Sequence, residues 1–157
     1  MKYIILYTIL ISSLLFACGN KNQTSAVNQD KTEAIENKIF VPVTTCYMGS
    51  MGKDSFHLKV ETFENVVTGS LAYLFYEKDQ QRGTFEGKFS SDTLWADYTY
   101  SSEGQTSIRQ IAFLIKDNMA IEGYGDMEEK DGRMVFKRAG DLQFGSGLKL
   151  NEVPCEN

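Results

Sequence analysis

The sequence predicts an all-β protein: a single antiparallel up-and-down β-barrel of about eight strands (calycin-like), preceded by a signal peptide and a flexible tether. From Val43 onward, apolar residues recur at every second position, which is the period of half-buried strands. Turn-forming residues separate these runs, and no sustained helical period accompanies them. The 157 residues leave room for one domain with a tail.

The composition narrows the function classes. The chain is 42% hydrophobic and 24% charged, as is ordinary for a globular protein. Its 16 Lys+Arg against 21 Asp+Glu give a net charge of −5, which argues against binding of nucleic acid.

Residues 1–17 predict a signal peptide. Lys2 supplies a basic start, and residues 4–16 form an apolar run that is too short to span a bilayer comfortably. The run ends in Leu15-Phe16-Ala17-Cys18-Gly19. This ending resembles the lipobox of bacterial lipoproteins, in which the cysteine is lipidated and becomes the first residue. A plain secretory signal with an incidental cysteine is the alternative.

The lipobox resemblance implies a membrane anchor at Cys18, with acyl chains such as palmitate. Two or three chains hold firmly, because each buried CH₂ contributes about 0.8 kcal/mol. Residues 18–40 are polar and predict a tether with a reach of roughly 25 Å. The resemblance to lipobox lipoproteins also implies that the anchor lies in the cell envelope, at the outer membrane. The absence of an acidic cluster behind Cys18 favours the periplasmic face over the cell surface.

Residues 41–157 are expected to form the barrel domain. The predicted strands are 43–50, 55–61, 65–78, 83–90, 93–101, 106–116, 119–127 and 133–138. Short connections favour pairing of each strand with the next, and closure into a barrel removes exposed edges. The tail 141–157 offers a short ninth strand.

Two hairpins can be given a register. A turn at Asp79-Gln80 places Leu74 opposite Phe85 and makes that face the buried one. A turn at Asp117-Asn118 places Arg109 and Glu122 on one face of the next such hairpin. Both faces of that hairpin are partly apolar, so we expect the tail, or the turn before Val41, to cover it.

Two cysteines remain besides Cys18, and an exported protein with one such pair generally bonds it. We therefore expect a disulfide between Cys46 and Cys155, since the first strand of a closed barrel lies near the chain end. Two free thiols or a metal-binding pair are the alternatives.

The sequence contains almost no recognisable catalytic motif, so we expect that the protein is not an enzyme and binds no cofactor. The single histidine, His57, lies opposite the apolar face of its strand and is expected on the surface. No Ser–His–acid order, P-loop or HExxH motif occurs. Met48, Met51 and His57 are a possible copper set, but ordinary core methionines are the favoured reading and no metal site is predicted.

Three groups of residues remain as candidate sites: the strand around Trp95, the turn 101–104 that leads to Arg109, and the segment 121–125 with Glu122. Trp95, Asp97 and Thr99 alternate with apolar residues along one strand. Arg109 is predicted to be a buried or half-buried hub bonded to a carboxylate. The candidates are Glu122 and Asp126 on the paired strand and Glu103 in the preceding turn. Such a hub is either a structural ion pair or an anchor for a ligand, and the structural role is favoured.

A wider motif set resembles that of small lipoproteins of unassigned function common in Bacteroidota. The matching segments are Cys46-Tyr47, 67–73, 77–79, 83–87, 92–98, 102–104, 107–113 and 122–125. This resemblance covers most of residues 44–137 and implies a fold and a location. The broader likeness is to calycin-type barrels, including periplasmic lysozyme-inhibitor lipoproteins. The Gly-x-Trp of the first lipocalin strand is missing here, because Trp95 lies in the middle of the chain.

These observations favour a monomeric, membrane-anchored periplasmic lipoprotein with a non-enzymatic binding barrel. Its partner would be a small apolar or amphipathic molecule, or an envelope protein. The alternative is a structural or inhibitor lipoprotein whose solid barrel acts through its loops. A cavity of about 300 Å³ or more, lined by the Leu74/Phe85 face, would favour a ligand carrier. A hydrolase would need a nucleophile–base pair that the sequence does not show.

Overall fold

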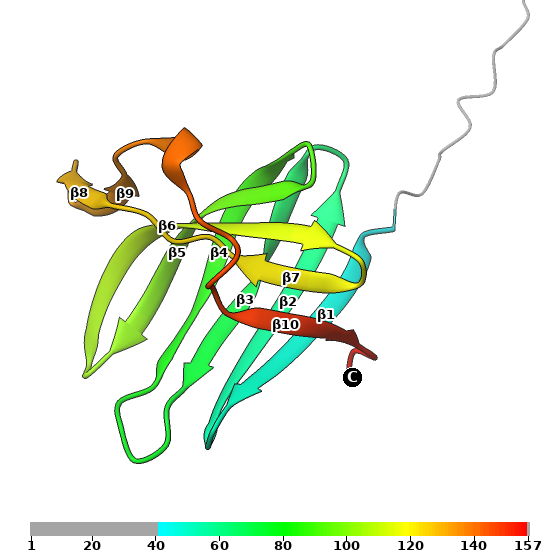
Figure 1. Ribbon diagram of the computed structural model, residues 1–157, viewed down its shortest axis with the longest axis horizontal. Coiled ribbons are helices and arrows are strands. Elements are labelled where there is room, and N and C mark those ends of the chain that lie inside the picture. Colours follow the sequence, from blue (N-terminus) through cyan, green and yellow to red (C-terminus); the bar gives the residue numbers. More distant parts are fainter. Residues whose placement is uncertain (1–40, 157) are drawn as a thin grey trace, which may run out of the picture. The chain divides into compact units, whose positions relative to one another are not determined.

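A computed structural model describes residues 41–156, which form a closed antiparallel barrel of eight strands (Figure 1). The barrel strands are β1 (Val43–Met51), β2 (Asp54–Phe63), β3 (Val66–Leu74), β4 (Gln81–Ser90), β5 (Thr93–Ser102), β6 (Gln105–Lys116), β7 (Met119–Glu122) and β10 (Lys149–Val153). Neighbours in the chain pair from β1 to β7, and β10 joins β7 to β1. The predicted fold class is confirmed. The predicted signal peptide (residues 1–17), Cys18 and tether (18–40) lie outside the described residues.

Within residues 41–156, no helix has the length and apolar character needed to cross a membrane.

The identity of the eighth barrel strand differs from the prediction. The predicted strand 119–127 ends at Glu122, and the chain then leaves the barrel to form the hairpin of β8 (Met127–Lys130) and β9 (Arg133–Phe136). The backbone of this hairpin pairs with the barrel sheet through one parallel bridge, between Arg109 and Met134. Figure 1 shows the hairpin beside β6. A short 3₁₀ turn, η1 (Ala139–Asp141), follows β9. The tail strand β10 takes the eighth place because its Leu150 is fully buried, whereas Met134 is 40% exposed.

The register predicted for β6 and β7 is confirmed. Phe113 pairs with Glu122, and Ile115 pairs with Ala120. The tail supplies the cover expected for this hairpin. Gln143 bridges Tyr124 through backbone hydrogen bonds of 2.9 and 3.0 Å, and the Phe144 ring fills the space that a side chain at Gly123 would occupy.

The register predicted for β3 and β4 is wrong. Phe85 pairs with Gly69 rather than with Leu74, so Leu71 and Tyr73 point inward and Leu74 points outward. The chain turns through the longer loop 75–80. The carboxylate of Asp54 accepts a hydrogen bond of 2.8 Å from the backbone N–H of Tyr76, which holds the start of this loop.

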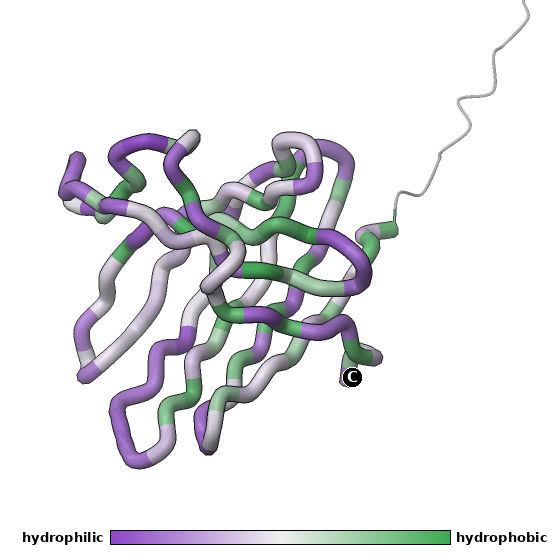
Figure 2. Tube along the Cα trace, in the orientation of Figure 1, coloured by the Kyte–Doolittle hydropathy of each residue, from purple (hydrophilic) through white to green (hydrophobic). Residues whose placement is uncertain are grey.

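The barrel interior is filled with side chains. Leu58, Leu71, Tyr98 and Phe113 are each at most 1% exposed. Figure 2 shows apolar and polar residues alternating along the long strands, as half-buried strands require. A continuous apolar stretch occurs where β6 approaches the β6–β7 turn (Figure 2).

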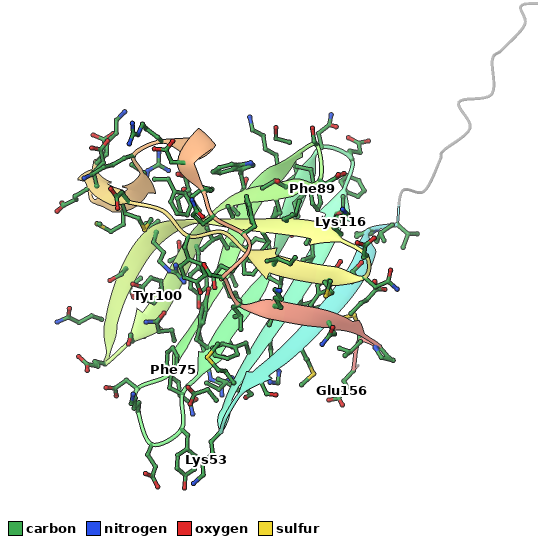
Figure 3. The ribbon with its side chains drawn as sticks, viewed as in Figure 1. Lys53, Phe75, Phe89, Tyr100, Lys116 and Glu156 are labelled. Carbon is green, nitrogen blue, oxygen red and sulfur yellow. A yellow bond between two sulfur atoms is a disulfide. The ribbon has the colours of Figure 1, made fainter. Side chains whose placement is uncertain are left out.

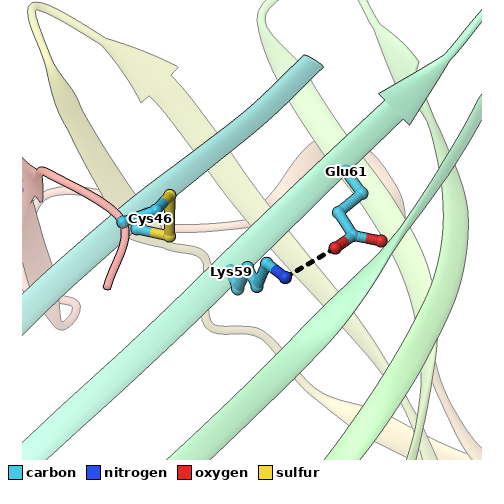
Figure 4. The surroundings of a disulfide bond; sticks show 4 residues. Cys46, Lys59 and Glu61 are labelled. Carbon is cyan, nitrogen blue, oxygen red and sulfur yellow. Dashed lines mark ion pairs between the residues drawn. A yellow bond between two sulfur atoms is a disulfide. The ribbon is translucent and has the colours of Figure 1, made fainter. Parts of the chain in front are cut away.

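The predicted disulfide is present and joins the first barrel strand to the chain end. Cys46 pairs with Val153 across β1 and β10, which brings Cys155 within bonding reach, with 5.3 Å between the two cysteine Cα atoms. Figure 4 shows the bond beside β2. The alternatives of free thiols and of a metal-binding pair are wrong. The bond spans a separation of 109 residues and therefore constrains almost the whole barrel in the unfolded chain.

Replacing both cysteines (Cys46→Ser with Cys155→Ser) should lower the free energy of unfolding by about 2–5 kcal/mol, because the unfolded chain regains the entropy of a long open loop. Urea unfolding of the mature protein measures this change. Reduced wild-type protein should lose a similar amount. A wild-type stability that reductant leaves unchanged would contradict the structural role of the bond.

Candidate functional site

A buried carboxylate lies inside the barrel at the end of β7. Glu122 is 2% exposed. Its Oε1 accepts a hydrogen bond of 2.6 Å from the hydroxyl of Tyr73, and its Oε2 accepts one of 2.8 Å from the hydroxyl of Tyr124. The Nη2 of Arg109 lies 3.6 Å from Oε1. We call Glu122, Arg109, Tyr73, Tyr98 and Tyr124 the Glu122 cluster.

Arg109 completes this cluster from β6. Its guanidinium carbon lies 5.2 Å from the centre of the Tyr73 ring and 5.7 Å from that of Tyr98, both within range of a cation–π contact. Burial lowers the pKa of Arg109, but the neighbouring Tyr73 and Glu122 outweigh this effect and raise it above its ordinary value. The arginine therefore carries its charge inside the barrel.

The tyrosines of the cluster are held in their protonated form. Burial, followed by the charge of Glu122, raises the pKa of Tyr73 well above its ordinary value of 10.0. Burial is also the main cause that raises the pKa values of Tyr98 and Tyr124. A protonated phenol is a hydrogen-bond donor, as the buried carboxylate requires.

Aromatic stacking surrounds the cluster. The hydroxyl of Tyr98 donates a hydrogen bond of 2.8 Å to the backbone oxygen of Leu71. Tyr100 stacks on Tyr98 at 5.0 Å between ring centres, and Phe75 stacks on Tyr73 at 6.3 Å; Figure 3 labels Tyr100 and Phe75. Among the described residues, no buried side-chain nitrogen or oxygen lacks a hydrogen-bond partner. Both carboxylate oxygens of Glu122 therefore have partners within the cluster, as a structural ion pair requires.

The structure brings together some of the predicted site residues and separates others. Arg109 and Glu122 meet, as described above. Asp126 is exposed beyond the end of β7, because the chain leaves the sheet before the register can bring it opposite Arg109. Glu103 is exposed in the β5–β6 turn, where a hydrogen bond with Asp79 raises its pKa. Neither acid is the partner of the arginine.

The possible copper residues are surface residues. His57 is exposed, as predicted. Met48 is 41% exposed and Met51 is 63% exposed, so the expectation that they are core methionines is wrong. Within residues 41–156, no group of three or more His, Cys, Asp or Glu side chains could hold a metal ion.

A large hollow lies on the outside of the barrel, and we call it the outer groove. It encloses about 1100 Å³. Outward-facing residues of β3, β4 and β5 form its floor, and residues of β2, β6 and β9 border it. A smaller hollow of about 360 Å³ lies beside the disulfide, where outward-facing Met48, His57 and Arg82 take part in the lining.

Two inward-facing glycines, Gly69 and Gly87, lie in the sheet under the outer groove. A Cβ at Gly69 would lie 1.9 Å from the backbone oxygen of Lys59, and one at Gly87 would lie 2.0 Å from that of Trp95. Only glycine permits this close approach of neighbouring strands. Neighbouring strands therefore lie very close together at these two positions, and both glycines line the outer groove.

The floor of the groove is built from cross-strand rows. One row carries hydroxyl groups and runs from Ser70 through Thr84 to Thr99. The next row consists of Thr68, Glu86, Asp97 and Gln110. Beyond it, Lys88 pairs with Trp95. A continuous polar surface with one indole results.

Contacts with β9 fix one side of this floor. Asp97 forms an ion pair with Arg133. The Trp95 ring meets Phe136 edge to face, with 6.1 Å between the ring centres. The backbone N–H of Phe136 donates a hydrogen bond of 3.2 Å to Oε1 of Gln110. The β8–β9 hairpin thus positions three floor side chains.

On the opposite border, Lys59 and Glu61 form an ion pair of 2.7 Å (Figure 4). The alternation of Trp95, Asp97 and Thr99 marked part of this groove in the sequence. The rest of the groove was missed, because it also depends on the close strand approach at the glycines and on β9, which the sequence assigned to the barrel.

No family model matches the chain, and neither a curated protein nor a solved structure matches it.

The Arg109→Ala variant should lose about 3 kcal/mol of stability or more, because it leaves the buried charge of Glu122 without its cation. Arg82→Ala is the matched control, because Arg82 is exposed and its guanidinium donates hydrogen bonds to Oε1 of Gln80. This variant should change the free energy of unfolding by no more than about 0.5 kcal/mol. Chemical denaturation measures both. An Arg109→Ala protein as stable as the control would refute a structural role for the cluster.

The raised tyrosine pKa values predict a loss of stability at alkaline pH. Above pH 10 the unfolded chain releases phenolic protons that the folded protein keeps, so their stabilising contribution is present below pH 10 and is lost as the pH rises through the folded-state values. Tyr73 and Tyr98 are buried, and each can remove up to about 1.4 kcal/mol per pH unit, whereas solvent screens the contribution of the half-exposed Tyr124. Urea unfolding at several pH values measures the slope, which Tyr73→Phe should reduce. A stability that stays constant above pH 10 would contradict this prediction.

Proposed function

We propose that the protein is a membrane-anchored, non-enzymatic binding protein of the bacterial cell envelope whose solid barrel acts through its outer surface. The packing of the interior carries this proposal. The inward positions are occupied by buried side chains, and the two hollows described above lie on the outside.

A ligand carrier of the lipocalin kind is the less favoured function. It would need a cavity lined by the face that contains Leu74 and Phe85. Leu74 points outward, whereas Phe85 is 3% exposed and packs against Gly69. Of the two functions expected from the sequence, the packing therefore favours the solid barrel.

The buried ionisable groups give little support to catalysis. Glu122 is bonded to two tyrosines and lies beside Arg109, which leaves it no free proton-transfer partner in the cluster. His57 is the single histidine of the sequence and the side chain best suited to act as a general base, but it is exposed on β2. Binding fits these residues better than hydrolysis does.

The proposed envelope location rests on the lipobox-like segment that ends at Cys18, and the disulfide supports it. A Cys46–Cys155 bond persists in oxidising compartments such as the periplasm and is rare in the bacterial cytosol. Acyl chains on Cys18 would hold the barrel at the membrane through the polar residues that follow.

Native mass spectrometry of protein extracted from its own membranes should give the mass of a chain that begins at Cys18 and carries acyl groups, with no small molecule inside the barrel. Cys18→Ala should lose the acyl mass and the membrane association. The Cys46→Ser, Cys155→Ser double variant is the control and should keep both. A wild-type chain without acyl groups would overturn the anchor, and a co-purifying apolar ligand would overturn the solid barrel.

A further inference from the structure

We infer that the outer groove binds a neutral oligosaccharide. This inference rests on the proposed function, since it names the ligand class for a barrel that acts through its outer surface. It follows from three properties of the groove floor: its charges balance, its side chains carry hydroxyl and carboxylate groups, and its backbone groups are already paired within the sheet.

The charges in the groove balance. Three cationic and three anionic side chains line it: Lys59, Lys88, Arg133, Glu61, Glu86 and Asp97. Two of the three cations are already paired, Lys59 with Glu61 and Arg133 with Asp97. A polyanion such as a nucleic acid would meet no surplus of positive charge here. The ligand that this groove complements is therefore neutral overall.

The side chains suit a ligand rich in hydroxyl groups. Carboxylates accept hydrogen bonds, while Ser and Thr hydroxyls donate and accept them. The row of Ser70, Thr84 and Thr99 lies next to the row that contains Glu86 and Asp97. A sugar ring presents hydroxyls around its edge and C–H groups on its faces. The half-buried indole of Trp95 can cover such an apolar face.

Two like charges face each other in the floor of the groove. Glu86 stands directly opposite Asp97 on β4 and β5, and like charges in this position destabilise a sheet. Arg133 neutralises Asp97, and the groove leaves Glu86 exposed. Ligand hydroxyls that donate to Glu86 would offset part of this cost.

An extended peptide fits the groove less well. Peptides that add to sheets pair with the backbone of a free edge. The floor strands β3, β4 and β5 are each paired on both sides, so their backbone groups are already bonded. A lipid chain also fits poorly, because the exposed apolar side chains of Val66, at the start of β3, and Ile108, on β6, are separated by polar side chains of the floor. The ligand has to bind side chains, as a glycan does.

The size of the groove indicates several sugar units. Its volume of about 1100 Å³ exceeds the usual range for a small-molecule site, about 300–1,000 Å³. A chain of linked rings would use the length of the floor from the β2 border to Arg133.

Tryptophan fluorescence tests this inference directly, because Trp95 is the single tryptophan of the chain. The full acylated protein, kept in a detergent without a sugar headgroup, is titrated with neutral hexasaccharides of glucose, mannose, galactose and N-acetylglucosamine. At least one should shift or quench the emission in a saturable way, and calorimetry then supplies the Kd.

Two groove variants locate the site. Glu86→Gln and Trp95→Ala should each weaken binding of that hexasaccharide at least tenfold. Glu128→Gln and Tyr76→Ala are matched controls on exposed residues outside the groove and should leave the Kd unchanged. Thermal unfolding verifies that each variant is folded. Trp95→Ala removes the packing against Phe136 and can disturb the fold. Glu86→Gln keeps the shape of the side chain, so it still tests the site if Trp95→Ala fails to fold.

The outcomes separate this inference from the proposed function. If none of the hexasaccharides binds, or if Glu86→Gln binds as tightly as the wild type, the glycan site is wrong. A saturable response to an extended peptide or to lipid vesicles instead also overturns the ligand class. In each of these cases the anchor and the solid barrel still stand or fall by the mass measurement above.

Discussion

The burial of one carboxylate constrains the rest of the barrel. Removing a charge from water costs several kcal/mol unless hydrogen bonds and an opposite charge replace the solvent. Glu122 therefore gathers Tyr73 from β3, Arg109 from β6 and Tyr124 from the segment after β7. The bond between Tyr73 and Glu122 joins β3 to β7, which are not neighbours in the sheet. The contacts of Glu122 place bonded polar groups at the centre of the barrel.

Closure of the barrel depends on residues at both ends of the domain. β7 is short, because the chain leaves the sheet directly after Glu122. The tail strand β10 fills the gap between β7 and β1 and buries Leu150, and the disulfide then holds Cys155 to β1. The segment released between β7 and β10 forms the hairpin that borders the outer groove. Closing the barrel and shaping the groove are thus consequences of the same break in the strand order.

The sequence predicted the features that depend on local patterns. Alternation gave the fold class, and the turn after Lys116 gave the pairing that puts Arg109 and Glu122 on one face. The β3–β4 register was not predictable, because both faces of residues 71–76 carry apolar or aromatic side chains and alternation cannot choose between them. The groove was signalled only by the Trp95 row, since its shape arises from close strand approach and from β9.

A double-mutant cycle between Tyr73→Phe and Glu122→Gln tests most directly whether the buried carboxylate holds the barrel together. Both changes keep the shape of the side chain, so the cycle reports the hydrogen bond and its charge. Residues in one hydrogen-bond network couple by about 0.5–3 kcal/mol. Because this bond is short and charged, we predict a coupling of about 1 kcal/mol or more in the free energy of unfolding. Effects that add to within about 0.3 kcal/mol would contradict the central place of Glu122 in this fold.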